Sequence, residues 1–411
     1  MQIHSSCLAT EFDGTKTKPG NDADGGNSRC VTSPHQREHS EPSLPCSVAR
    51  VPRTAWMKGR PTVTNLSLPV TYLVGSANAP TRQTAMRKFE SLWHYLPSFP
   101  EGDTAFPSWI MPRLRATFAL PGMTKVDNGN IELGYEGMPS YEYRGEAELE
   151  IPSVLLGYFE QAEAAKPILD RMIHEHGEQK PYQANIIDPY DHAFFALGAA
   201  GVTDHYESFR KPALEEIAAI HRLFHGDVVF QLESPGRTVT METIESQEER
   251  TAKAVALASD LAEFVRRMPA GARVTIHLCR GDWEHTSWMK QINGYEPVVL
   301  LANAIVAEWP EGRTLEGIHI PLAGADVLPL VDTPDMYRQL EQLTTDVPIY
   351  AGIVHEQADA ERIVTALTQA RQYYSRPFGG LSTSCGMARM TEAEMDRALR
   401  LLAELMERVT G

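Results

Sequence analysis

Apolar residues follow two patterns, and segments of the two kinds take turns along this chain. Short runs are apolar at almost every position, and longer segments carry apolar residues every three or four positions. Continuous apolar runs are typical of strands that are buried on both faces of a parallel sheet, and the longer segments are typical of amphipathic helices. Strands are therefore expected at eight places: Val70–Ser76, near Trp93–Phe99, Tyr182–Ile187, Val228–Glu233, Arg273–Cys279, Gly317–Leu322, Pro348–His355 and Gly380–Cys385.

Helices are expected between these strands and after the last one. Thr391 followed by Glu394 is a capping-box signal for the start of the final helix,. Its apolar residues Met395, Leu399, Leu402 and Leu405 form one stripe, which we expect to pack on the core,. The clearest helical segments are Ser246–Arg267, Glu296–Trp309, Asp335–Leu343, Asp359–Tyr374 and Glu392–Val409.

Eight strands that mostly alternate with helices favour an α/β fold of the (β/α)8, or TIM, barrel type. An open doubly wound sheet is the rival, but its glycine-rich phosphate loop is not what Val74-Gly75-Ser76-Ala77-Asn78 offers after the first strand,. The segment 113–177 is long enough to hold an insertion, and Pro167 is expected to break or kink its helix,. Residues 1–66 lack periodic apolar positions and are expected to form a flexible tail, which leaves 67–411 as the barrel,.

Composition and charge narrow the class of protein. The chain has 411 residues, 42% of them hydrophobic and 22% charged, which is ordinary for a globular protein,. Its formal net charge of -16 makes it a poor general binder of nucleic acid or of anionic membranes,. It has neither a transmembrane run of about eighteen apolar residues nor a signal-like N-terminus. A soluble, cytoplasmic protein is therefore expected.

The sharpest chemical signal is the pair His277-Leu278-Cys279. Residues two apart on a strand face the same side, so the imidazole and the thiol are expected to point together, as two ligands of a tetrahedral Zn²⁺ would. Cys385 ends the last expected strand, and the neighbouring glycines allow a close backbone approach to the same point,. The alternative is a buried His–Cys pair without a metal and a Cys385 that only fills the core.

Other polar residues fall at strand ends, where a barrel places its catalytic groups. His319 is either a fourth metal ligand, a general acid or a structural histidine, and the same three roles are open to His355,. Glu233 is suited to bind a substrate ammonium group, or forms a salt bridge at the rim. Ser76, Asp103 and Asp188 complete this set, although a loop acid such as Asp103 is usually only solvated.

These motifs resemble the C-terminal catalytic barrel of cobalamin-independent methionine synthase and its single-barrel relatives, among them the epoxyalkane:coenzyme M transferase type. The similarity runs from about Leu68 to the C-terminus and rests on His277-x-Cys279, Cys385-Gly386 and Gln231-Leu232-Glu233-Ser234-Pro235. A poorly characterised subgroup is more similar still. It shares His-Leu-Cys-x-Gly-Asp, Ile-His-x-Pro, Cys-Gly-Met and an acidic segment, here Pro100-Glu101-Gly102-Asp103-Thr104, before Trp109-Ile110.

The resemblance implies a role for each matching residue. His277, Cys279 and Cys385 would bind zinc, and His355 would be the proton-donating histidine of the seventh strand. Gly75 and Ser76 would contact the thiol substrate, and Glu233 its amine. Asp103 and Trp109 belong to the segment that marks the subgroup, and we count them with the substrate-binding residues.

Two departures from the family pattern matter. The synthases carry a zinc-ligating Glu on the sixth strand, where this chain has Ile318-His319-Ile320-Pro321, so either His319 substitutes or the fourth position is open. The synthases' Asp-Glu pair is Glu233-Ser234 here, which weakens the expectation that homocysteine is the substrate.

The expected function is zinc-dependent transfer of a methyl or alkyl group to a small thiol, from a donor such as a reduced methylfolate. Zinc deprotonates a bound thiol and leaves its sulfur nucleophilic, and an acid such as His355 would protonate the leaving group. One rival is a zinc-dependent lyase or an epoxide-opening thiol transferase on the same site. The other is a metal-free barrel that binds a small molecule and has no activity.

Overall fold

The computed structural model describes residues 70–104, 110–130, 137–288 and 294–410. The expected tail, 1–66, lies outside these residues, so the domain division at residue 67 stays a prediction. Within the described residues, no helix combines the length and the apolar character needed to cross a lipid bilayer.

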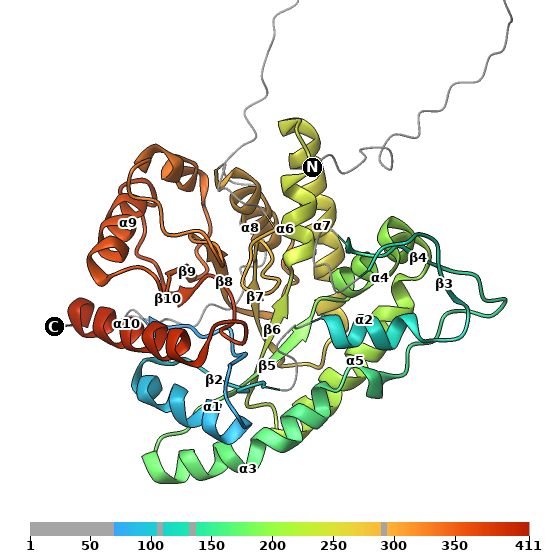
Figure 1. The fold of residues 1–411 in the computed structure, drawn as a ribbon, viewed down its shortest axis with the longest axis horizontal. Helices are drawn as coiled ribbons and strands as arrows, with labels where there is room; N and C mark the ends of the chain where they lie inside the picture. The colour runs from blue at the N-terminus through green and yellow to red at the C-terminus, as the bar shows by residue number, and fades with distance from the viewer. Residues whose placement is uncertain (1–69, 105–109, 131–136, 289–293, 411) are drawn as a thin grey trace, which may run out of the picture. The chain divides into compact units, whose positions relative to one another are not determined.

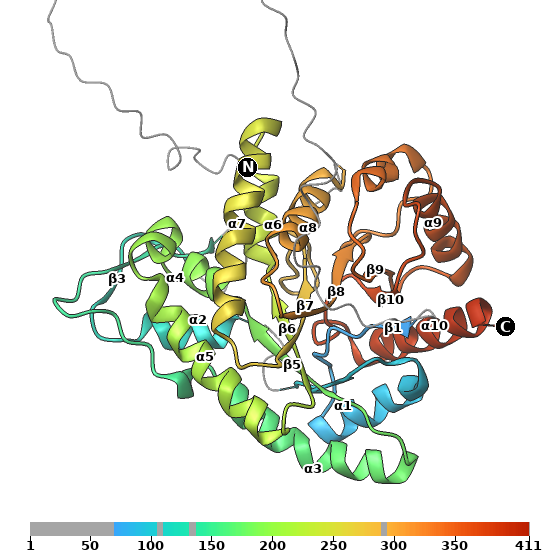
Figure 2. The same cartoon turned by 180° about the vertical axis from the view of Figure 1, so that it is seen from behind.

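Eight parallel strands form the centre of the fold, and helices surround them (Figures 1 and 2). From the second barrel strand to the last, each strand is hydrogen-bonded to the next one along the chain, and the first strand is paired with the last. The remaining gap, between the first two strands, is closed by a parallel bridge from Ser76 to Asp103. The expected (β/α)8 barrel is thus confirmed. Its strands are β1 (Val70–Thr71), β2 (Phe99–Pro100), β5 (Tyr182–Ile187), β6 (Val228–Glu233), β7 (Arg273–His277), β8 (Thr314–Pro321), β9 (Ile349–Val354) and β10 (Gly380–Thr383).

The helices follow the expected pattern most closely in the C-terminal half. In the last helix the four stripe residues are buried. Its capping box is formed, with the Thr391 N–H donating to Glu394 Oε2 at 2.7 Å and the Glu394 N–H donating to Thr391 Oγ1 at 3.3 Å. The helices are α1 (Arg82–Phe89), α2 (Met111–Phe118), α3 (Tyr158–His176), α4 (Pro189–Asp204), α5 (Tyr206–Leu223), α6 (Pro235–Glu242), α7 (Gln247–Arg267), α8 (Glu296–Glu308), α9 (Ala360–Tyr373) and α10 (Glu392–Thr410).

Three local expectations are wrong. Trp93 lies in a 3-10 helix, Glu90–Tyr95, because its ring is buried against Phe99 and His176, and the second strand is only Phe99–Pro100. The segment expected as a helix at Asp335–Leu343 is a 3-10 helix, Pro334–Gln342. The break expected at Pro167 does not occur, since burial of Ala162, Ala165, Leu169 and Met172 holds α3 together despite the missing N–H donor,.

The long segment between the second and third barrel strands does contain an insertion. The antiparallel strands β3 (Met123–Lys125) and β4 (Tyr141–Tyr143) pair only with each other, outside the barrel sheet. The Tyr141 ring stacks on Phe118 of α2 with 3.9 Å between ring centroids. This contact attaches the hairpin to the helix that precedes it.

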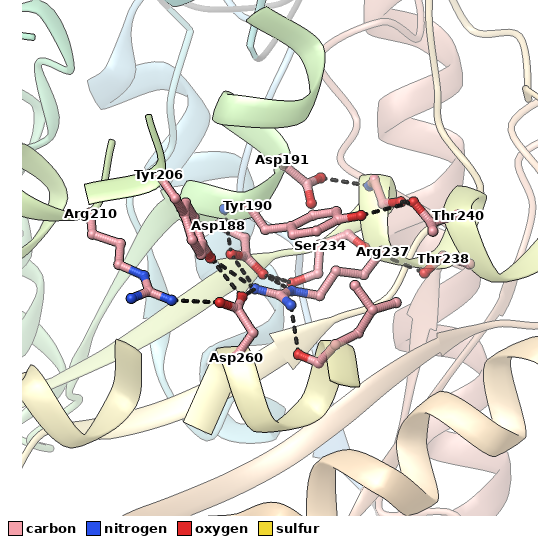
Figure 3. A network of polar contacts seen from close by, with 12 residues as sticks. Asp188, Tyr190, Asp191, Tyr206, Arg210, Ser234, Arg237, Thr238, Thr240 and Asp260 are labelled. Atoms are coloured by element: carbon pink, nitrogen blue, oxygen red, sulfur yellow. Dashed lines mark hydrogen bonds and ion pairs between the residues drawn. The ribbon is translucent and has the colours of Figure 1, made fainter. Parts of the chain in front are cut away.

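A buried ion-pair network joins α4, α6 and α7 (Figure 3). The Arg237 guanidinium is fully buried and donates to both oxygens of Asp188, which is also fully buried, at 2.5 and 3.0 Å. It also donates to Asp260 Oδ2 at 2.7 Å and to the Leu257 carbonyl at 2.6 Å. Asp188 follows a strand end, as a catalytic residue of a barrel would, but its carboxylate serves this network.

Burial of His192 in α4 predicts loss of stability in acid. Its Nε2 lies 2.9 Å from Thr117 Oγ1, and burial first, then Arg113, lowers its pKa from 6.5 to about 3. Below pH 6.5 the unfolded chain therefore binds a proton at this histidine and the folded chain does not. The free energy of unfolding decreases as pH falls from about 6.5 toward 3, by roughly 1.4 kcal/mol per pH unit. We expect His192→Gln to remove about that slope from urea unfolding measured with a chelator between pH 7 and pH 5.

The matched control is His94→Gln, because the His94 side chain is 77% exposed. This variant should keep the wild-type dependence of unfolding free energy on pH. An unchanged slope in His192→Gln would show that His192 takes up its proton in the folded protein.

Candidate metal and substrate site

A row of chemically active residues crosses three neighbouring barrel strands. Glu233 at the end of β6 is in register with His277 at the end of β7, which is in register with His319 of β8. Residues in register on parallel strands face the same side of the sheet, so this pairing brings the three side chains together. All three are buried.

The sulfur atoms of Cys279 and Cys385 meet beside His277. The two Sγ atoms lie 3.5 Å apart, and Cys385 Sγ lies 3.8 Å from His277 Nε2. Candidate ligand atoms of the three residues all lie within 4.8 Å of one another. Zn–S bonds of about 2.3 Å at tetrahedral angles separate two sulfur ligands by roughly 3.8 Å, so this donor set fits zinc.

Gly386 allows the loop after β10 to come this close to the first strand. A Cβ on Gly386 would lie 2.1 Å from Ser76 Oγ, so no larger residue fits there. The Met387 N–H donates to the Ser76 carbonyl at 3.0 Å, which fixes the approach. The close backbone approach expected around Cys385 is thus observed.

The protein favours the thiolate form of Cys385. A hydrogen bond from Cys279 and the charge of Arg389 lower the pKa of Cys385, while the same hydrogen bond and burial raise the pKa of Cys279. Arg389 Nη2 donates to Cys385 Sγ at 3.3 Å, and its Nε lies 3.0 Å from Asp282 Oδ2. Burial lowers the pKa of His277 well below 6.5, so its imidazole is neutral and able to bind a metal,.

A cavity that is partly open to solvent is lined by the three candidate ligands. Apolar side chains such as Phe195, Trp283 and Trp288 form part of its wall. Carboxyl groups line it as well, and two guanidinium groups, Arg113 and Arg389, reach it. A small organic molecule with a polar end would fit such a cavity.

The carboxyl groups of this cavity are poorly solvated. Burial, then the negative charges of Cys385 and Glu101, raise the pKa of Glu233 well above its usual range. Burial and the neighbouring Asp103 raise the pKa of Glu101 to about 8. A cationic group bound here would favour the ionised form of these carboxyl groups.

The structure brings together most of the residues expected from the sequence. Gly75 has a φ of 109°, and a Cβ there would lie 2.7 Å from Asn185 Nδ2, so it shapes the strand end beside the cavity. His319 and His355 are not among the lining residues. Trp109 lies outside the described residues. Those that do line the cavity are Ser76, Asp103, Glu233, His277, Cys279 and Cys385.

His355 belongs to a separate buried cluster. Its Nδ1 accepts a hydrogen bond from the Gln357 N–H at 3.1 Å and lies 3.2 Å from Glu356 Oε2. The other oxygen of Glu356 lies 3.2 Å from His285 Nε2. His355 Nε2 is buried and has no hydrogen-bond partner in the part of the chain that the structure describes.

Sequence reasoning missed several residues of the cavity. Arg389 lies four positions after Cys385, in the turn that leads to the last helix. This short separation in the sequence was the only signal that Arg389 could reach the site. Trp283 and Trp288 follow the His-x-Cys motif in the long loop after β7. Tyr158 and Phe195 come from α3 and α4, far from any recognised motif.

Comparison with known proteins gives structural similarities only. No family model matches the chain, and no curated protein matches it. A B12-independent methionine synthase from a Shewanella species, solved in complex with selenomethionine, shares 14% identity at a TM-score of 0.49, covering 84% of this chain and 98% of that one. A methyltransferase from Methanosarcina mazei shares 13% identity at a TM-score of 0.46, covering 84% and 94%.

A third structure is described as a vitamin-B12-independent methionine synthase from Listeria monocytogenes. It shares 16% identity at a TM-score of 0.43, covering 84% of this chain and 99% of that one. Two of the three structures carry the name of the family that the motifs resemble. At these identities and TM-scores the similarity carries no conclusion about this chain.

Proposed function

We propose that this protein transfers a methyl or alkyl group to a small thiol at a zinc site formed by His277, Cys279 and Cys385. The observation that carries the proposal is the spacing of these three donors at the floor of a cavity. Among the residues that the structure describes, no fourth His, Cys, Asp or Glu joins the group. Three protein ligands and one open position are typical of catalytic zinc sites.

Zinc bound there would lower the pKa of a substrate thiol in the open position and leave its sulfur nucleophilic. Side chains of the protein would orient the thiol substrate. Glu233, 3.0 Å from Gln231 Nε2, is held in place to bind a substrate ammonium group. Ser76 and Asp103, which close the barrel, would contact the same substrate.

The transfer step is a displacement at carbon. The thiolate sulfur forms a bond to the methyl or alkyl carbon, the bond from that carbon to its oxygen or nitrogen leaving group breaks, and the leaving group keeps the electron pair. A proton from an acid then neutralises the leaving group. We assign this acid to His355 by its resemblance to the family histidine alone, because its side chain does not line the cavity in this structure.

The test measures metal first and transfer second. Protein purified without chelator should contain about one zinc per chain. The cobalt-substituted protein should change its visible spectrum when a small aminothiol such as homocysteine is added. Mass spectrometry should then detect S-methylated thiol when methylfolate or methylcobalamin is supplied.

Each result separates the candidates. Thiol adducts formed from an epoxide, with no methylated product from either methyl donor, would replace methyl transfer by epoxide opening. A chain that contains no zinc and binds none on addition would contradict the proposal and favour the metal-free barrel.

A further inference from the structure

His319 contacts His277 on the side away from the cavity. The Nδ1 atoms of the two rings lie 2.9 Å apart, and His319 Nε2 lies 2.9 Å from the Thr383 carbonyl of β10. Both nitrogens of His319 are thus used within the protein. This excludes the arrangement in which His319 supplies the fourth ligand without first leaving its partners.

Hydrogen bonding assigns the protons of this pair. His277 Nε2 faces Cys385 Sγ, so a lone pair is needed there for a metal and the proton of His277 must sit on Nδ1,. His277 Nδ1–H then donates to the lone pair of His319 Nδ1, at 2.9 Å. The Leu278 carbonyl lies 3.3 Å from the same nitrogen, a longer contact that carries no proton in this arrangement. His319 must in turn carry its proton on Nε2, where the Thr383 carbonyl accepts it.

The surrounding strands form a socket for the His319 ring. A Cβ on Gly352 of β9 would lie 2.6 Å from His319 Nε2, so only glycine leaves room for the ring. The Thr383 side chain donates to the Cys385 carbonyl at 2.6 Å. The chain of contacts His277–His319–Thr383–Cys385 therefore connects two of the three candidate ligands behind the site.

We propose that His319 is a positioning residue of the metal site, which fixes the tautomer and the ring orientation of His277 through a hydrogen-bonded chain ending at Thr383. This inference rests on the proposed function, because it assumes that His277 binds a metal. Partners that hold a metal-ligating histidine in this way commonly change metal affinity 10- to 100-fold when they are removed.

The experiment compares His319→Phe with wild type in the full chain. Phenylalanine keeps the size of the ring and removes both hydrogen bonds. We expect zinc affinity, measured by competition with a chromogenic chelator, to fall about 10- to 100-fold. The cobalt-substituted variant should show altered visible bands, because the imidazole is no longer held in one orientation.

Two further variants separate positioning from general destabilisation. His192→Phe makes the same change at a buried histidine outside the cavity and should keep wild-type zinc affinity. His319→Asn keeps an acceptor near the position of Nδ1 and should recover part of the affinity lost in His319→Phe. Thermal unfolding with chelator reports the fold of each variant without the metal.

Equal zinc affinity and an unchanged cobalt spectrum in folded His319→Phe would overturn the inference. So would a loss of the same size in His192→Phe. Wild-type protein that binds zinc but transfers no alkyl group would defeat the proposed function and leave the role of His319 standing. Wild-type protein that binds neither metal would defeat both.

Discussion

Replacement of Cys385 by serine is expected to remove most of the bound zinc and to abolish alkyl transfer. Cys385 is the central donor of the candidate site, 3.5 Å from Cys279 Sγ and 3.8 Å from His277 Nε2. A tetrahedral zinc site in a protein is worth about 10–16 kcal/mol, so one lost thiolate costs about 3 kcal/mol, or on the order of 100-fold in affinity. Elemental analysis and chelator competition measure both quantities.

Neighbouring variants show whether the loss comes from the thiolate. Cys279→Ser should behave like Cys385→Ser, because each removes one sulfur from the same group. Ser384→Ala removes a hydroxyl from the same turn, one that donates to the Gly324 carbonyl at 2.9 Å, and should retain zinc. A full equivalent of zinc held with wild-type affinity in Cys385→Ser would exclude Cys385 as a ligand.

The sequence predicts the barrel well from the third strand onward because the strands there are determined locally. The strands at 182–187 and 228–233 are almost wholly buried, and their expected ends are the observed ones. The N-terminal half is harder to predict because β1 and β2 are only two residues long. The bridge that joins them connects Ser76 and Asp103, which are far apart in the sequence, so no local pattern predicts it.

The candidate ligands could be predicted because all three lie at or just beyond strand ends on the same rim of the barrel. His277 ends β7, while Cys279 and Cys385 each lie two residues beyond the last residue of β7 and β10. The position of His319 depends on atoms that no sequence pattern reports. Its two nitrogens are used because Thr383 and His277 approach from opposite sides and Gly352 leaves room for the ring.

The surroundings of the site were the least predictable part. Arg389 reaches Cys385 only because the chain turns sharply after Gly386. Asp188, by contrast, follows a strand end as a catalytic residue would, and the structure places it in an ion pair instead. The position of an acid at the rim of a barrel therefore does not tell whether its carboxylate faces substrate or a buried cation.

Replacing Arg237 by methionine is expected to destabilise the fold by about 3–5 kcal/mol, because it leaves the Asp188 carboxylate buried without its counter-charge,. The Tyr190 N–H and the Ser234 hydroxyl still donate to Asp188, each at 2.9 Å, but neither neutralises it. Urea unfolding at pH 7 measures this loss.

The matched control is Arg267→Met, which breaks an ion pair of similar geometry in solvent. Arg267 donates to both oxygens of Glu207, at 2.7 and 2.5 Å, with 36% and 51% of the two side chains exposed. We expect a loss below about 1 kcal/mol there, because exposed pairs are screened by water. If Arg237→Met cost no more than this control, the charge of Arg237 would not be what stabilises the network. The stabilisation would then come from hydrogen bonds and packing, because an unpaired buried charge is what makes breaking a buried ion pair costly.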